Sequence, residues 1–457
     1  MKLTTSVPRG LAKTRSLLDS LVAMPDLAPA LRSLPPHAFA ALVRRVGVED
    51  AGELVALATT PQLVQAFDED LFVAERAGDR EALDSRRFAV WLEVLLEAGD
   101  AVAARRVAEL DEDFVAHALA GMLLVLDEDA LRQTLDDADE DEARQLDKEL
   151  EGALSEDVDG YVLIAKQHEG WDAALSLILA LDRDHRALLV RLLDRLAALG
   201  SGYLDDLDDL SEVLTEAESL AEDVEAARDG RRSAQGYVEP RAARAFLQLA
   251  RGPREQGTDA EARDPLTRAY FRELGPTQPT RLWSTSPLTG GVRALPAEVQ
   301  RALEEYDGGG ASLAELGRSA TAMAALVGAL QDLSEAQPSV FVQRMEELAY
   351  LANVLVAGHQ REGQRMPPGA AADAALATVG YGAALEARAA LPARSRKGSL
   401  RLACTQAALG RALADHAADL LFRNASAALA TGAAPALSGS RESGVLYSAE
   451  QLEAALA

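Results

Sequence analysis

The chain has 457 residues, of which 48% are hydrophobic and 26% charged, so it can bury real cores and is not globally disordered. Its net charge of −27 repels nucleic acid and anionic lipid, and the absence of any run of eighteen apolar residues predicts no membrane insertion. The length exceeds that at which one core stops growing, so we expect two or three domains.

The number of cysteines and the first ten residues indicate in which cellular compartment the protein is expected. The segment 1–10 has a positive charge but no apolar stretch after it, which predicts no secretory signal. The single cysteine, Cys404, excludes an intramolecular disulfide and predicts a reducing compartment, the cytoplasm. Residues 400–409 have a helical pattern without a histidine-and-carboxylate partner, so a packed thiol is favoured over a nucleophile. Only 5 of the 46 basic residues are lysines, a bias that we attribute to a GC-rich bacterial genome.

Proline placement predicts a chain of helices. No proline lies between Pro61 and Pro240, so no helix need be broken there. Elsewhere proline often precedes a periodic apolar stretch, as it does at the first position of helices. These prolines are Pro36, Pro61, Pro240, Pro296, Pro338 and Pro367.

Apolar residues recur at the helical spacing i, i+3, i+4, i+7 in several stretches, and the stretches are short. Three examples lie within 88–96, 188–196 and 341–355. Only Tyr161–Ile164 has the composition of a strand, and it could equally open a helix.

A faint repeat accompanies these helices. Leu110–Asp113 and Leu126–Asp129 both read Leu-Asp-Glu-Asp, and Asp68–Asp70 precedes another apolar stretch. Each places an aspartate where it could cap the N-terminus of a helix, with more acid in the first turn. We therefore predict an all-α fold of stacked short helical hairpins, superhelical and repeat-like, with a second helical domain at the C-terminal side.

Composition divides the chain into three parts. We expect an N-terminal helical repeat-like domain over residues 1–251 and a C-terminal helical domain over 297–457. Residues 252–296 hold six of the eighteen prolines and predict a Pro/Gly-rich linker or irregular excursion. Within the last part, Ser448–Gln451 has the form of a capping box that opens a short helix.

Two stretches hold most of the excess negative charge. Residues 126–157 contain 14 acids and three bases, a net charge of −11, and residues 205–229 contain 11 acids and one base, a net charge of −10. Residues 361–423 carry a net charge of +4, from nine bases and five acids. The stretches predict either a solvated helix face or a surface for a basic partner.

The motifs of known chemistries are absent. Asp137, Asp139 and Asp141 alternate as in an EF-hand, but Glu142 occupies the glycine position and Lys148 the position of the bidentate glutamate. The sequence also lacks the Gly-rich phosphate loops and the Gly-x-Ser-x-Gly nucleophile motif. We predict no catalytic, cofactor-binding or metal-binding residue and no cofactor.

No two of the six histidines stand at a metal-ligand spacing. His168, with Trp171 and near Tyr161, could line a pocket, although a packed helix contact is favoured. His359 follows Gly358 at the expected end of a helix, where it would meet the negative end of the dipole. The histidines are His37, His117, His168, His185, His359 and His416.

Several segments resemble an uncharacterised bacterial family, a domain of unknown function. They are Leu34–Pro36 with Ala40–Val43, Val48–Asp50, Ala58–Leu63, Asp159–Tyr161, Asp223–Ala227, Gln235–Tyr237, Ala242–Phe246 and Met345–Val356. This likeness covers roughly 31–251 and 338–385, and the family carries no established activity to transfer. More distantly, the Leu-Pro-Pro opening and the acid-capped helices look like the cytosolic helical domain of MgtE-type magnesium channels, a similarity of architecture alone.

Three hypotheses about function follow. The first is a cytoplasmic protein-interaction scaffold or adaptor that presents an acidic helical surface to a protein partner. The second is a divalent-cation-responsive module in which acids at Asp136–Glu142 or Asp205–Asp209 gather Mg²⁺ or Ca²⁺. The third, less favoured because no catalytic signature is present, is an enzyme with a pocket between the helical halves, near Gly252–Pro296. The sequence predicts neither a partner's identity nor an oligomeric state.

Overall fold

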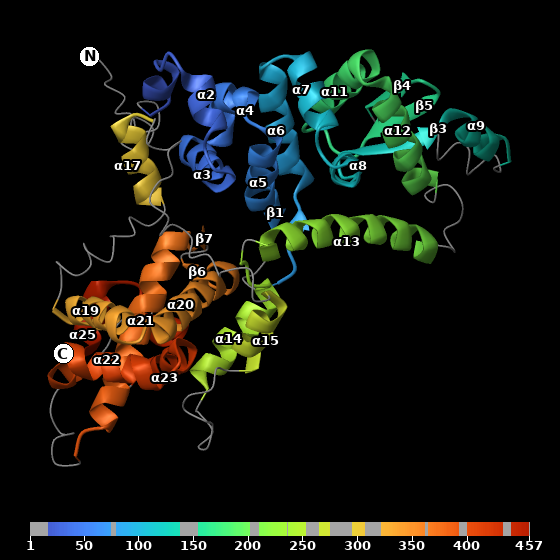
Figure 1. The fold of residues 1–457 in the computed structure, drawn as a ribbon. Coiled ribbons are helices and arrows are strands. Elements are labelled where there is room, and N and C mark those ends of the chain that lie inside the picture. The colour runs from blue at the N-terminus through green and yellow to red at the C-terminus, as the bar shows by residue number, and fades with distance from the viewer. Residues whose placement is uncertain are drawn as a thin grey trace, which may run out of the picture. The chain divides into compact units, whose positions relative to one another are not determined.

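The computed structural model (Figure 1) forms two compact units. Unit 1 comprises residues 1–73, 81–228 and 289–300, and unit 2 comprises residues 74–80, 229–288 and 301–457. The chain is described over residues 17–74, 79–137, 154–201, 210–234, 236–252, 265–274, 295–306, 321–361, 364–392, 400–432 and 440–456.

Unit 1 consists of short helices, as the apolar spacing predicts. Proline stands in the first turn of α3 (Pro36–Val46) and of α5 (Thr60–Asp70), where its missing N–H leaves no hydrogen bond unmade. The helices are α2 (Leu27–Arg32), α3 (Pro36–Val46), η1 (Val48–Asp50), α4 (Gly52–Leu57), α5 (Thr60–Asp70), α6 (Ser85–Glu97), α7 (Asp100–Ala108), α8 (Glu112–Ala120), α9 (Glu128–Asp137), α11 (Trp171–Asp184) and α12 (Arg186–Ser201). α13 (Leu210–Ala234) and α17 (Ala297–Tyr306) each contain residues of both units.

Four aromatic side chains form the centre of the unit 1 core. Phe67 of α5 meets Trp91 of α6 edge to face, with ring centroids 5.0 Å apart, and stacks on Phe114 of α8 at 5.7 Å. Phe88 of α6 contacts both phenylalanines edge to face. All four rings are buried, so the predicted stripe of α6 faces the core that α5 and α8 share.

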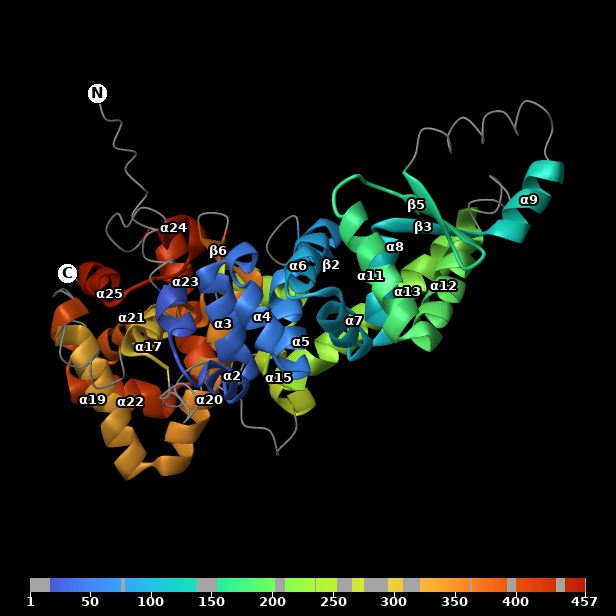
Figure 2. The same ribbon diagram turned by 90° about the horizontal axis from the view of Figure 1, so that it is seen from above.

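A three-stranded antiparallel sheet lies within unit 1, in the order β3 (Leu123–Asp127), β5 (Tyr161–Ala165), β4 (Ser155–Val158). β3 packs on α12, as Figure 2 also shows, and its Leu126 belongs to a small cluster with Leu131 of α9 and Ile164. Two further strands, β1 (Phe72–Val73) and β2 (Ala82–Leu83), form a hairpin after α5.

The strand alternative for Tyr161–Ile164 is therefore confirmed, and the helical alternative is wrong. The reason is local: Asp159 and Gly160 both have positive φ, of 56° and 87°, and connect Val158 to Tyr161 as a two-residue hairpin turn. An Asp-Gly pair favours this turn because it tolerates the left-handed backbone that the strand twist requires. The sheet is a small departure from the all-α expectation.

The described part of unit 2 consists mainly of helices, with one short hairpin. Its elements are α14 (Pro240–Arg251), α15 (Pro265–Leu274), α19 (Thr321–Ala336), α20 (Pro338–Gly358), β6 (Gln360–Arg361), β7 (Gln364–Arg365), α21 (Pro368–Ala389), η2 (Leu400–Ala403), α22 (Gln406–Asp415), α23 (Ala418–Ala430), α24 (Ser440–Ser443) and α25 (Ala449–Leu456). The predicted all-α class is thereby confirmed, and a helical unit 2 agrees with the expectation of a second helical domain.

Helix α21 lies at the centre of unit 2 and packs against α19, α20, α22, α23 and α25. Its sequence is rich in alanine and glycine, which lets neighbouring helices approach closely. A Cβ placed on Gly382 would stand 2.0 Å from the carbonyl oxygen of Leu421 in α23. Glycine is therefore required here for close packing of two helices.

The boundary between units 1 and 2 lies at a different place from the predicted domain boundary. The predicted N-terminal domain ends at Arg251, whereas unit 1 ends its central segment at Arg228. Helix α14 accordingly belongs to unit 2, where Phe246 packs against Tyr350 of α20 and Phe422 of α23. Of the predicted linker, only α15 and residues 295–296 are described beyond Gly252.

Among the described helices, none combines the length and the hydropathy that crossing a membrane would take.

Candidate functional site

The first acidic stretch starts at the end of β3. Asp127 accepts a hydrogen bond from the backbone N–H of Ala130 at 2.8 Å and so caps α9, as its Leu-Asp-Glu-Asp motif predicts. Asp111 of the other such motif caps α8 in the same way. Further along, Glu156 and Asp157 are exposed on β4, an outer strand of the sheet. Residues 138–153, with Asp139 and Asp141, lie outside the described part of the chain.

The second acidic stretch forms much of α13, an unbroken helix in Figure 1. Leu220, Val224 and Arg228 are buried at four-residue spacing, which fixes one face of the helix against the rest of unit 1. A different face carries the stripe Glu218, Glu222, Glu225 and Asp229, at i, i+4, i+7 and i+11. We call these four residues the α13 acidic stripe; three are exposed and Glu225 is half-buried.

Arg228 fixes the inner face of α13. Its guanidinium donates to the carbonyl oxygen of Asp68 at 2.6 and 3.0 Å and pairs with Glu81 at 2.6 Å. It also stands 4.0 Å from the ring centroid of Phe72. Arg228 and Glu81 are only 3% and 6% exposed, so the pair is desolvated and its geometry matters for stability.

Asp68 belongs to a third acidic motif, Asp68–Asp70, for which the prediction of an N-cap is wrong. These residues form the last turn of α5, and the apolar stretch after them becomes β1 rather than a helix. Negative charge at the C-terminus of a helix opposes the dipole and needs compensation.

Arginines from three helices surround this turn. Arg44 of α3 donates to the backbone and to the carboxylate of Glu69, both at 3.2 Å, and Arg228 of α13 donates to Asp68. Arg87 of α6 pairs with Asp70 at 2.7 Å and with Glu49 of η1 at 2.9 Å. Opposite charge and hydrogen bonding thus compensate a turn that the dipole disfavours.

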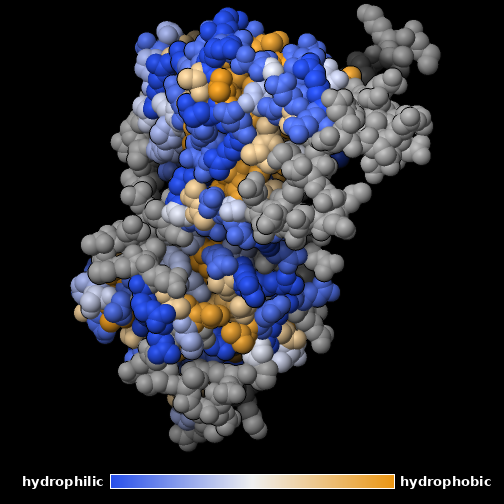
Figure 3. Space-filling model, turned by 90° about the vertical axis from the view of Figure 1, so that its right-hand side faces the viewer, coloured by the Kyte–Doolittle hydropathy of each residue, from blue (hydrophilic) through white to orange (hydrophobic). Residues whose placement is uncertain are grey.

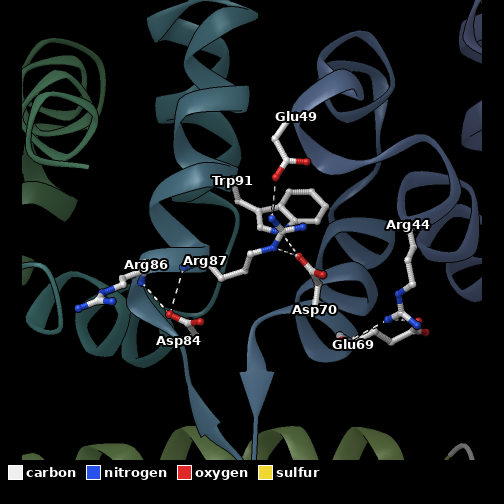
Figure 4. A network of polar contacts seen from close by, with 8 residues as sticks. All are labelled: Arg44, Glu49, Glu69, Asp70, Asp84, Arg86, Arg87 and Trp91. Atoms are coloured by element: carbon white, nitrogen blue, oxygen red, sulfur yellow. Dashed lines mark hydrogen bonds and ion pairs between the residues drawn. The ribbon is translucent and has the colours of Figure 1, made fainter. Parts of the chain in front are cut away.

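Figure 4 shows Arg87 between Glu49 and Asp70. The same Asp70 oxygen accepts from the indole N–H of Trp91 at 2.7 Å. A backbone hydrogen bond, reinforced by Arg87, holds the pKa of Glu49 below its usual value. Since the charged groups satisfy one another, this network fastens η1, α5 and α6 together and is not a ligand site.

Near the Asp159–Gly160 turn, carboxylates gather around one tyrosine. The hydrogen bond from Tyr161 to Asp194 of α12, with burial and the charges of Asp127 and Asp159, raises the pKa of Tyr161 to about 12. Arg186 pairs with Asp159 at 2.7 Å and therefore compensates part of this charge. A phenol held protonated at neutral pH is a hydrogen-bond donor and not a base.

The surroundings of Cys404 do not favour a reactive thiol. Burial, with a smaller contribution from Glu453, raises the pKa of Cys404 to about 11, and its Sγ lies 3.3 Å from the carbonyl oxygen of Leu400. The thiolate needed for nucleophilic attack is therefore scarce at neutral pH. This supports the packed-thiol interpretation.

The histidines do not converge either. His168 is exposed and Trp171 is buried at the start of α11, beyond one end of β5, whereas Tyr161 begins the other end. The pocket considered for these three residues is therefore not formed. His359 follows α20 as predicted, and its backbone N–H bonds to Leu355. Its ring nitrogen meets the hydroxyl of Tyr447 at 2.8 Å.

Within the part of the chain that the structure describes, no group of three or more His, Cys, Asp or Glu residues has a metal-binding arrangement. The side chains on which the cation hypothesis depends, at Asp136–Glu142 and Asp205–Asp209, lie outside it. Most of Gly252–Pro296, near which a pocket was considered, does so as well.

Comparison with known proteins agrees with the family resemblance. The model of a family of unknown function, DUF6178, matches residues 10–269, more than half of the chain. No curated protein and no solved structure matches, so the similarity to MgtE-type channels gains no support. The chain belongs to DUF6178, a family of unknown function.

Proposed function

We propose that this protein is an interaction scaffold or adaptor that binds a basic protein partner through the α13 acidic stripe. The observation that carries the proposal is the two-sided construction of α13. Leu220, Val224 and Arg228 anchor one face, while Glu218, Glu222 and Asp229 stand exposed on another. A rigid helix with a fixed row of carboxylates suits the recognition of a surface that carries lysine or arginine.

The α13 acidic stripe lowers the stability of its helix, which favours a role beyond solubility. Like charges four residues apart, such as Glu218 and Glu222, destabilise a helix by a few tenths of a kcal/mol. A partner with positive charge removes this repulsion. On the face seen in Figure 3, hydrophilic residues predominate, with hydrophobic residues between them. The stripe itself is made of carboxylates, so charge would guide such a contact.

The proposal places the protein in the cytoplasm, where a half-buried Cys404 stays reduced. It excludes nucleic acid as the partner of this surface, because phosphate and the stripe repel each other. Electrostatic recognition of this kind weakens with added salt, since exposed charges are screened within about 10 Å at 0.1 M ionic strength.

A matched pair of charge reversals tests the proposal. Glu218→Lys with Glu222→Lys inverts part of the stripe. Glu93→Lys with Glu97→Lys makes the same change of charge at the same spacing on the exposed face of α6. In affinity capture from a lysate of the source organism at low salt, we expect a basic protein that the wild type and the α6 variant retain and the α13 variant loses.

Capture should also fall when the salt concentration is raised. Equal retention by the two variants, or the absence of any enriched protein at low and at high salt, would contradict the proposal. Circular dichroism of both variants controls for unfolding.

A divalent-cation-responsive module is the alternative proposal. Carboxylate oxygens suit Mg²⁺ and Ca²⁺, and residues 126–157 and 205–229 concentrate such groups. A melting temperature that rises with millimolar Mg²⁺ or Ca²⁺ at constant ionic strength would favour it. An unchanged melting temperature would dispose of it and leave the partner hypothesis untouched.

A further inference from the structure

We draw no further inference here: the strongest candidate, the buried hydroxyl of Tyr381 on α21 in the core of unit 2, which has no hydrogen-bond partner among the residues that the structure describes, is a single side chain within a hydrophobic cluster, and nothing in the structure shows what would bind beside it.

Discussion

Arginine side chains in both units donate to carbonyl groups at the C-terminal ends of neighbouring helices. Arg32 donates to Leu57 at the end of α4, Arg228 to Asp68 near the end of α5, and Arg344 to Leu413 in α22. The last carbonyls of a helix have no partner within it and lie at the negative end of its dipole. Many short helices have many such ends, so the abundance of arginine has a structural use that composition alone did not indicate.

Arg344 and Glu347 together form hydrogen bonds with the ends of two other helices. These residues pair at 2.7 Å on α20 and are 8% and 1% exposed. While Arg344 bonds the end of α22, Glu347 accepts from the N–H of Ala418, the first residue of α23, at 2.7 Å. Each charge meets the helix end of opposite polarity, which fastens the connection between α22 and α23.

The buried pair in unit 1 gives the first prediction. Arg228→Met removes the ion pair with Glu81 and the hydrogen bonds to Asp68, and we expect a loss of about 3–5 kcal/mol in the free energy of unfolding. Adding Glu81→Met should recover much of this loss, because no buried carboxylate then remains without its arginine. Urea denaturation measures the free energy of unfolding of the single and of the double variant. A double variant as unstable as Arg228→Met alone would contradict this explanation.

A second prediction concerns pH. Burial raises the pKa of Asp373 on α21 to about 6, above its ordinary value of 3.8. The folded protein therefore favours the protonated acid, and this residue's contribution to stability is lost as the pH rises through about 6. Asp373→Asn should stabilise the protein by about 1 kcal/mol at pH 7.5, because the amide carries no charge.

The stabilisation by Asp373→Asn should shrink as the pH is lowered from 6 towards 4. Chemical denaturation at pH 7.5, 6 and 4.5 measures this trend. A difference between variant and wild type that does not change with pH would show that ionisation of Asp373 is not its cause.

At the scale of the element, the sequence predicts helices well where one face is buried. The stripes of α6, α12 and α20 lie where the spacing places them, and the prolines at Pro36, Pro240 and Pro338 begin helices. The apolar spacing and the position of proline are both local signals. The strand β3 was not predicted because residues 117–126 form one apolar run, which fits a helix as well as a buried strand.

Local signals of this kind cannot predict polar contacts between residues that are far apart in the sequence. Arg228 and Glu81 are 147 positions apart, and nothing in either neighbourhood indicates a pair. Asp70 resembles an N-cap in sequence and proves to lie at the end of α5, because Phe72–Val73 after it forms a strand that pairs with Ala82–Leu83. The stripe of α13, by contrast, could be read from spacing alone once the helix was assigned. What could not be read was which face Arg228 would bury.

Two glycines of unit 2 give a matched prediction for helix packing. Gly382→Ala would place a Cβ 2.0 Å from the Leu421 backbone, so α21 and α23 must separate, at a cost of about 3 kcal/mol. Gly410→Ala in α22 meets Ala329 at an ordinary 3.8 Å and should stabilise by about 0.5–1 kcal/mol. Melting temperatures of the two variants should shift in opposite directions; a shift in the same direction would contradict the packing argument.

For the whole molecule, the charge of −27 is not evenly distributed. Part of it lies in carboxylates that arginines compensate, such as Glu49, Glu69 and Asp70 around α5. Another part lies on α13, where Glu218, Glu222 and Asp229 are exposed and Arg228 is buried on a different face. The sequence indicated the stretch, and the fold determines which of its carboxylates face outward.

Zero-length cross-linking tests the central proposal most directly. A carbodiimide joins a carboxylate to a lysine only when the two are in contact, so treatment of a native lysate followed by mass spectrometry identifies the carboxylates that touch a partner. We predict cross-links from Glu218, Glu222 or Asp229 to lysines of one basic protein, lost at high salt. Cross-links to partners that involve other carboxylates and none of the stripe would contradict the account.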